Sequence, residues 1–182
     1  MTDIRTVGVI GAGQMGAGIA QVSAQAGYDV VLYDVSLDLA KKGIEKIAAG
    51  LDRLVAGGKL DADAREAALK RLKPADGVND LGPCDLVIEA ATEKEEIKRR
   101  IFAQVCPVLR PDAILASNTS SISITRLASG TDRAERFLGI HFMNPVPVMK
   151  LVELVRGIAT DETTFKTAKE FVSSLDKTIT VA

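Results

Sequence analysis

A glycine-rich turn near the start of the chain constrains the fold more than any other feature. Residues 11–16 follow the pattern Gly-x-Gly-x-x-Gly, between an apolar run at 6–10 and an expected helix at 14–25 that Gly27 terminates. A second apolar run follows at 29–33. Strand, glycine turn, helix and strand in this order form a βαβ unit. The opening of the chain therefore predicts an α/β fold.

The glycine turn also has the residues of a loop that binds a dinucleotide. The first glycine permits a tight turn, the second lets the backbone approach a pyrophosphate, and the third lets the helix pack closely on the strand. Free N–H groups and the dipole at the N-terminus of the helix attract the same anion. In the alternative interpretation, the glycines only pack a βαβ crossover. The candidate cofactor ligands in this turn are Gly11, Gly13, Gln14, Met15 and Gly16.

Asp34 stands at the end of the second apolar run and has no Arg beside it. A carboxylate at this point binds the ribose diol of an adenosine, and it would repel the 2′-phosphate of NADP. The strand, the turn, the helix and Asp34 together predict a site for NAD.

The alternation of helices and strands then has one long interruption. Apolar residues at steps of three and four over 37–54 predict an amphipathic helix. Asp61 or Asp63 can cap a second helix that runs to about residue 72. We therefore expect a helical hairpin at about 36–72, inserted between strands.

The remaining elements continue in the same order to the end of the chain. A weak strand is expected near Val78, and the continuous apolar run at 85–90 is typical of a buried parallel strand. The predicted fold is therefore α/β, a Rossmann-type, doubly wound and mostly parallel sheet with an inserted helical hairpin. The later strands are expected at 113–116, 137–142, 149–155 and 177–181, and the later helices at about 97–108, 123–129 and 161–175.

Composition excludes several classes of function. The 182 residues are 47% hydrophobic, and 23 Lys and Arg against 24 Asp and Glu give a net charge of −1. That balance gives no general attraction to nucleic acid or to an anionic membrane, and no apolar stretch is long enough to span one. Cys84 and Cys106 stand apart from each other and from the single histidine, so neither a metal site nor a disulfide framework is expected. We therefore expect a cytoplasmic protein.

The single histidine, His141, ends an apolar strand at the edge where doubly wound sheets bind their ligands. Pro145 and Pro147 would turn the chain so that the next strand runs back and brings Glu153 near His141. A histidine paired with a carboxylate is a common general base near neutral pH. In the alternative interpretation, Glu153 is only a solvated charge on an exposed strand face.

Five small polar residues, 117–121, follow the strand that ends at Ala116. At the carboxyl end of a strand, their side chains can hydrogen-bond a substrate oxygen or a nicotinamide ribose. Ser120 or Ser121 can instead be the N-cap of the next helix.

These residues together resemble the NAD-binding part of the L-3-hydroxyacyl-CoA dehydrogenases, above all the bacterial 3-hydroxybutyryl-CoA type. The resemblance runs from Thr6 to the end of the chain, and its most specific stretches are 9–16, 117–121 and 141–153. It implies an oxidoreductase of fatty-acid metabolism that reversibly oxidises the 3-hydroxyl of an L-3-hydroxyacyl-CoA with NAD.

The resemblance also implies roles for individual residues. His141 would take the hydroxyl proton, Glu153 would orient its imidazole, and Ser120 would hydrogen-bond the reacting oxygen. Two charged residues that the resemblance assigns to the nicotinamide ribose also have an alternative interpretation. Glu93 would then be only an acid favoured in the first turn of a helix, and Lys98 only a solvated lysine. The resemblance places Asn144 and Asn118 in the substrate pocket, and Glu93, Lys98 and Asn118 near the nicotinamide ribose.

The chain departs from the family pattern in two ways. The hairpin has Gly50 where the family has a serine, which leaves Arg53 and Lys59 as candidates for contact with CoA. The family also continues with a helical domain that covers the substrate cleft and forms a homodimer, so we expect residues 1–182 to be an NAD-binding domain without that second part. Two other interpretations stay open: a β-hydroxyacid dehydrogenase of small carboxylates, whose catalytic lysine and glycine-rich substrate motif are not found here, and a non-catalytic NAD-binding domain or fragment.

Overall fold

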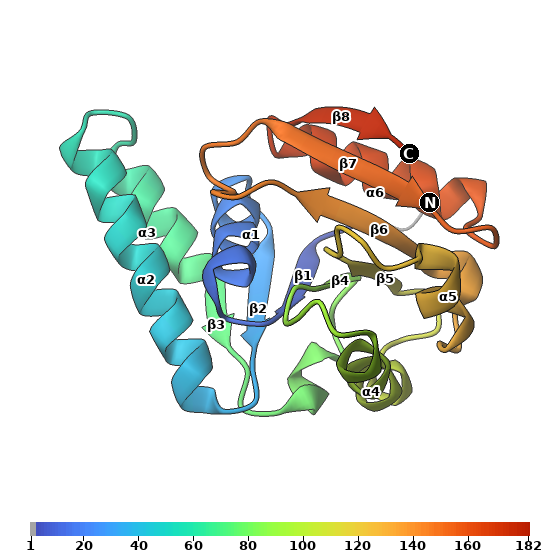
Figure 1. Ribbon diagram of the computed structural model, residues 1–182. Helices are drawn as coiled ribbons and strands as arrows, with labels where there is room; N and C mark the ends of the chain where they lie inside the picture. Colours follow the sequence, from blue (N-terminus) through green and yellow to red (C-terminus); the bar gives the residue numbers. More distant parts are fainter. Residues whose placement is uncertain (1–2) are drawn as a thin grey trace.

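A computed structural model describes residues 3–182, and in this range eight strands form one sheet (Figure 1). The strand order is β3-β2-β1-β4-β5-β6-β7-β8. All neighbours from β3 to β6 are parallel, β6 and β7 are antiparallel, and β8 lies parallel to β7. The mostly parallel, doubly wound sheet predicted from the sequence is therefore confirmed.

The observed bounds agree with the expected elements to within a few residues, apart from one edge strand. The strands are β1 Thr6–Ile10, β2 Asp29–Tyr33, β3 Leu72–Pro74, β4 Leu86–Glu89, β5 Ile114–Ser117, β6 Phe137–Phe142, β7 Leu151–Arg156 and β8 Thr178–Val181. The α-helices are α1 Gln14–Gln25, α2 Leu37–Ala56, α3 Ala62–Arg71, α4 Glu95–Val105, α5 Ile124–Ser129 and α6 Glu162–Ser174.

Helices cover both faces of the sheet, and the strands alternate their side chains between two apolar clusters. Leu86 and Ile88 of β4 join the cluster that includes residues of α1 and α6, whereas Val87 joins the one that includes residues of α4 and α5. Burial on both faces explains why the central strands are continuous apolar runs.

The predicted helical hairpin is formed by α2 and α3, which pack on α1 at the β3 end of the sheet (Figure 1). The Ser36 side chain caps α2 by accepting the Leu39 N–H. The Asp61 carboxylate caps α3 by accepting the Ala64 N–H. Of the two acids considered for this cap, Asp61 is therefore the one used.

The prediction of a weak strand near Val78 is wrong. Val78–Leu81 is a turn of 3-10 helix, and the strand at this edge of the sheet is β3, which follows α3 directly and pairs only with β2. Its three residues, Leu-Lys-Pro, are too few to show a period, and proline is tolerated in a strand at an edge.

The carboxyl ends of the parallel strands meet along one edge of the sheet, as expected for a site at the loops. The glycine turn follows β1, Asp34 follows β2, and Asn118 follows β5. Among the helices of residues 3–182, none combines the length and the apolar character needed to cross a membrane.

Candidate active site

The glycine turn has the close packing and the open front that a bound pyrophosphate needs. Gly11 has φ 104°, in the left-handed region, and a Cβ at Gly16 would lie 1.6 Å from the Gly11 carbonyl oxygen. In contrast, a Cβ at Gly13 would meet no heavy atom within 4 Å. Gly13 is also the N-cap of α1, whose first turn carries no acid and no side-chain cap. The space and the free N–H groups fit the dinucleotide predicted from the sequence.

Asp34 lies beside this turn and is bonded to it. Its Oδ2 accepts the Ala12 N–H at 2.7 Å, and its Oδ1 accepts the Val35 N–H at 2.6 Å. Each carboxylate oxygen can accept a further hydrogen bond. Asp34 can therefore hold both the turn and a ribose diol.

A pocket of about 220 Å³ lies next to the start of α1 and the ends of β4 and β5. Its lining joins residues that were singled out from distant parts of the sequence. It is lined by Met15, Ala90, Ala91, Thr92, Glu93, Lys98 and Asn118. Four of these seven are predicted cofactor residues, so the fold brings the two halves of the predicted cofactor site together.

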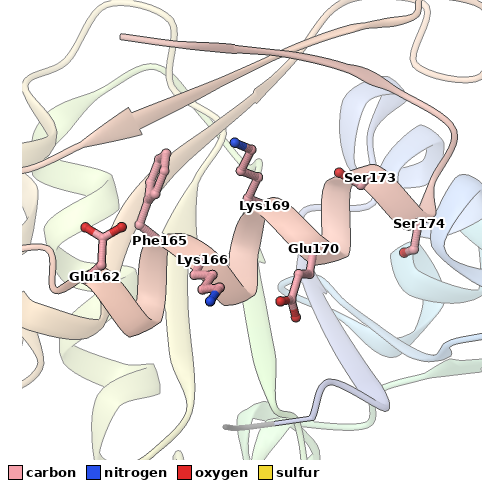
Figure 2. Close-up of a pocket in the computed structure, with 7 residues that line it drawn as sticks. All are labelled: Glu162, Phe165, Lys166, Lys169, Glu170, Ser173 and Ser174. Carbon is pink, nitrogen blue, oxygen red and sulfur yellow. The ribbon is translucent and has the colours of Figure 1, made fainter.

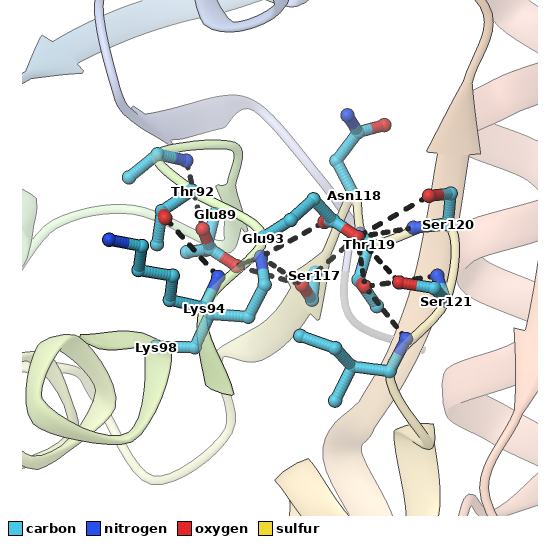
Figure 3. Close-up of polar contacts among 12 residues, drawn as sticks. Glu89, Thr92, Glu93, Lys94, Lys98, Ser117, Asn118, Thr119, Ser120 and Ser121 are labelled. Carbon is cyan, nitrogen blue, oxygen red and sulfur yellow. Dashed lines mark hydrogen bonds and ion pairs between the residues drawn. The ribbon is translucent and has the colours of Figure 1, made fainter. Parts of the chain in front are cut away.

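Glu93 binds the polar loop that follows β5 (Figure 3). Its Oε2 accepts hydrogen bonds from the hydroxyls of Ser121 at 3.0 Å, Thr119 at 3.1 Å and Ser120 at 3.3 Å, and from the Ser120 N–H at 3.3 Å. Burial alone would raise the pKa of Glu93, but these bonds and the positive charge of Lys98 outweigh it and hold the pKa below its usual range. Glu93 is therefore a carboxylate at neutral pH.

The alternative role of Ser120 or Ser121 as a helix cap is wrong. Ser123 caps α5, since its Oγ accepts the Arg126 N–H. Ser120 and Ser121 instead face Glu93, and Ser120 lines a second pocket of about 390 Å³ that Glu153 also lines.

Lys98 is not a solvated lysine, because its side chain is 1% exposed. Its Nζ donates to Glu89 Oε1 at 2.6 Å and lies 3.7 Å from Glu93 Oε1. Glu89 is fully buried and was not singled out from the sequence. The signal was present, because a glutamate ends an otherwise apolar strand. Such a charge needs a buried partner.

His141 and Glu153 are opposite each other in the antiparallel pair β6–β7. His141 Nδ1 lies 3.2 Å from Glu153 Oε2, and the two side chains are 19% and 38% exposed. The expected approach of these side chains is therefore confirmed, and Glu153 is not only a solvated charge. Asn118 links this pair to the pocket of about 220 Å³, because it lines that pocket and its Oδ1 accepts the Phe142 N–H at 2.8 Å.

Two predicted residues are not among those that line these two pockets. Asn144 is exposed in the turn between β6 and β7, and Gln14 is exposed at the start of α1. A larger hollow of about 830 Å³ lies elsewhere, along the outer face of α6 (Figure 2). All of its lining side chains come from that one helix, and none is a predicted site residue.

The comparisons with known proteins give the family. Residues 6–182 match the family described as the NAD-binding domain of 3-hydroxyacyl-CoA dehydrogenase. The chain belongs to this family. Membership confirms the resemblance found in the sequence, and with it NAD as the cofactor.

The relatives of this NAD-binding domain are longer than the chain. It is 60% identical over 179 residues to a 3-hydroxybutyryl-CoA dehydrogenase of Bradyrhizobium diazoefficiens, covering 98% of the chain and 61% of that relative. It is 50% identical to a 3-hydroxyadipyl-CoA dehydrogenase of Escherichia coli, of which it covers 34%. The crystal structure of (S)-3-hydroxybutyryl-CoA dehydrogenase from Ralstonia eutropha superposes with a TM-score of 0.96 at 47% identity, over 98% of this chain and 63% of that one.

Proposed function

We propose that this domain works in an NAD-dependent 3-hydroxyacyl-CoA dehydrogenase whose substrate is a short-chain L-3-hydroxyacyl-CoA such as 3-hydroxybutyryl-CoA. The observation that carries the proposal is the His141–Glu153 pair, at the same sheet edge as the pocket that Met15, Lys98 and Asn118 line. When bound, NAD accepts the hydride that leaves C3 of the substrate. The names of the relatives support the substrate class.

His141 is the proposed general base. Glu153 accepts the Nδ1–H of the neutral imidazole, which leaves Nε2 free to take the proton of the 3-hydroxyl. The same carboxylate then stabilises the imidazolium. Ser120 is proposed to hydrogen-bond the reacting oxygen, and for this its hydroxyl must rotate away from Glu93.

The remaining proposed roles follow the position of each residue along the sheet edge. The glycine turn holds the pyrophosphate and Asp34 the adenosine ribose. Asn144 and Asn118 line the substrate side. The ligands proposed for the cofactor are Gly11, Gly13, Gln14, Met15, Gly16, Asp34, Glu93, Lys98 and Asn118.

We also propose the wider setting in which the domain works. Residues 1–182 would be one NAD-binding domain that acts with a C-terminal part like that of its longer relatives, within a homodimer. Cys84 and Cys106 are free and buried, and burial raises the pKa of the Cys84 thiol to about 12. Unreactive thiols of this kind suit a reducing compartment, and we propose the cytoplasm.

The test is the oxidation of NADH with acetoacetyl-CoA, compared with acetoacetate, which lacks CoA. It is run on the 182-residue chain and on the chain joined to the C-terminal part of the Bradyrhizobium relative. We expect turnover of acetoacetyl-CoA by the joined chain and little with acetoacetate. NADH binding without turnover by either protein would favour a non-catalytic NAD-binding domain. Faster turnover of acetoacetate would favour an enzyme of small carboxylates.

A further inference from the structure

Glu89 is a fully buried carboxylate next to the proposed cofactor pocket. It ends β4, in register with Ile10 of β1 on one side and Ser117 of β5 on the other. The next two residues in the chain, Ala90 and Ala91, line the pocket. Glu89 therefore lies where the strands that carry the site come together.

Both oxygens of the Glu89 carboxylate have partners (Figure 3). Oε1 accepts hydrogen bonds from Lys98 Nζ at 2.6 Å and from Ser117 Oγ at 2.7 Å. Oε2 accepts the Ala91 N–H at 2.8 Å. The backbone donor and the neighbouring strand fix the carboxylate, and the fixed carboxylate in turn fixes the lysine.

Lys98 extends from α4 to this point and lines the pocket. A buried ammonium without a charged partner is unstable, because it has left water and gained nothing in return. Glu89 supplies that partner, and the Lys98 Nζ atom then lies 3.7 Å from Glu93 Oε1. The position of the ammonium relative to the pocket and to Glu93 is thus set from the buried side by Glu89.

We propose that Glu89 is a positioning residue for the nicotinamide end of the bound cofactor, acting by holding the Lys98 ammonium in the pocket wall. This inference rests on the proposed function, since it takes the pocket beside Lys98 to hold the nicotinamide ribose. The competing explanation is that the Glu89–Lys98 ion pair only stabilises the fold.

Glu89→Gln is the informative substitution because it keeps the shape and removes the charge. A glutamine has one acceptor oxygen and one NH₂ group, so it cannot accept from Lys98, Ser117 and the Ala91 N–H together. The Lys98 ammonium then loses its closest charged partner. It keeps only Ser117 Oγ at 3.3 Å and Glu93 Oε1 at 3.7 Å, so its position is no longer set by a buried charge.

The measurement is the affinity of the 182-residue chain for NADH and for ADP, by calorimetry. ADP lacks the nicotinamide and its ribose but keeps the part that the glycine turn and Asp34 would bind. In Glu89→Gln, we expect NADH affinity to fall at least about tenfold while ADP affinity stays within about twofold. Unchanged NADH affinity, or an equal loss for NADH and ADP, would overturn the proposal.

Asp85→Asn is the matched control. Asp85 is also a buried carboxylate with a charged partner, Arg110, but it precedes β4 and so lies at the opposite edge of the sheet. Asp85→Asn should lower the melting temperature without changing the ratio of NADH affinity to ADP affinity. A change of that ratio equal to the one in Glu89→Gln would show that any buried ion pair of this domain affects the pocket, and would overturn the specific role of Glu89.

A second set of variants tests whether Glu89 acts through Lys98, and applies even if Glu89→Gln does not fold. Glu89→Gln/Lys98→Met has no buried charge at either position. We expect it to discriminate NADH from ADP no better and no worse than Lys98→Met alone, within about twofold. Discrimination equal to that of the unchanged chain, or a further loss beyond Lys98→Met, would contradict the proposal. If the unchanged chain does not bind NADH, the proposed function itself fails.

Discussion

Glu153 lies directly across β6–β7 from His141, with its Oε2 atom 3.2 Å from His141 Nδ1. Both residues are within strands, so the register of an antiparallel pair, rather than a loop, sets their separation. Directly opposite side chains of such a pair are close neighbours. The imidazole is therefore oriented before any substrate binds.

We predict that His141 and Glu153 act as one unit in turnover. In the chain joined to the C-terminal part of a relative, His141→Ala should lower kcat by about 10²–10⁴-fold, because the general base is lost. Adding Glu153→Gln to His141→Ala should cost little more, since Glu153 acts through the imidazole. Steady-state rates with acetoacetyl-CoA and NADH check this, with NADH affinity as the control for folding. Separate, additive losses would contradict the pairing.

A second prediction separates two glycines of the same turn. Gly16→Ala would place a Cβ 1.6 Å from the Gly11 carbonyl oxygen, so it should cost at least about 1–3 kcal/mol of stability. The Cβ of Gly13→Ala would meet no heavy atom within 4 Å, so we expect its free energy of unfolding to lie within about 0.5 kcal/mol of that of the parent. Its methyl group should nevertheless weaken NADH binding, because it fills the space in front of the helix N-terminus. Urea denaturation and NADH titration of both variants decide the matter. Equal stability of the two would refute the packing role of Gly16.

A third prediction concerns the choice between NAD and NADP. Asp34 should favour NADH strongly, since its carboxylate repels a 2′-phosphate. Asp34→Ala should weaken NADH binding and narrow the preference. Because Asp34 also accepts the Ala12 N–H, we expect a loss of thermal stability in the same variant. Titration with NADH and NADPH measures the preference, and tighter binding of NADPH by the unchanged chain would contradict it.

The sequence was sufficient for those parts of the site whose geometry is local. The glycine turn could be read because one backbone conformation requires Gly11 and one close contact requires Gly16. The approach of His141 and Glu153 could be read because two prolines force a turn between two apolar strands. In both cases the decisive residues are close in the sequence.

The parts that could not be read depend on contacts between distant segments. A glutamate at the end of an apolar strand indicates that Glu89 has a buried partner, but only the packing of α4 shows that this partner is Lys98. The bonds of Ser120 and Ser121 to Glu93 join the loop after β5 to the one after β4. Strand β3 could not be predicted, because three residues at the edge of a sheet are too few to show an alternation of apolar and polar side chains.

The last prediction uses Asp85, which fastens the start of β1 to β4 and to Arg110. Its Oδ2 accepts the N–H groups of Arg5 at 2.9 Å and Thr6 at 3.0 Å, and its Oδ1 pairs with the Arg110 guanidinium. Burial alone would raise the pKa of the Asp85 carboxyl. The bonds from Thr6, Arg110 and Arg5 outweigh burial and hold the pKa below its ordinary value of 3.8. Asp85→Asn should therefore cost about 1–3 kcal/mol at pH 7.

The stability lost in Asp85→Asn should depend on pH. Since the folded state has the lower pKa, the stabilisation by Asp85 is complete well above pH 3.8 and is lost as the pH falls through the pKa of the folded state. The difference in unfolding free energy between the parent and Asp85→Asn should thus be constant from about pH 7 to 5 and shrink below about pH 4. Asp112→Asn is the matched control, because Asp112 pairs with the same Arg110 but is 55% exposed. The loss of unfolding free energy in Asp112→Asn should stay below about 1 kcal/mol at every pH. Urea denaturation of the three proteins across this range measures the difference, and a gap that widens on acidification would show that the Asp85 carboxyl is not held ionised by the fold.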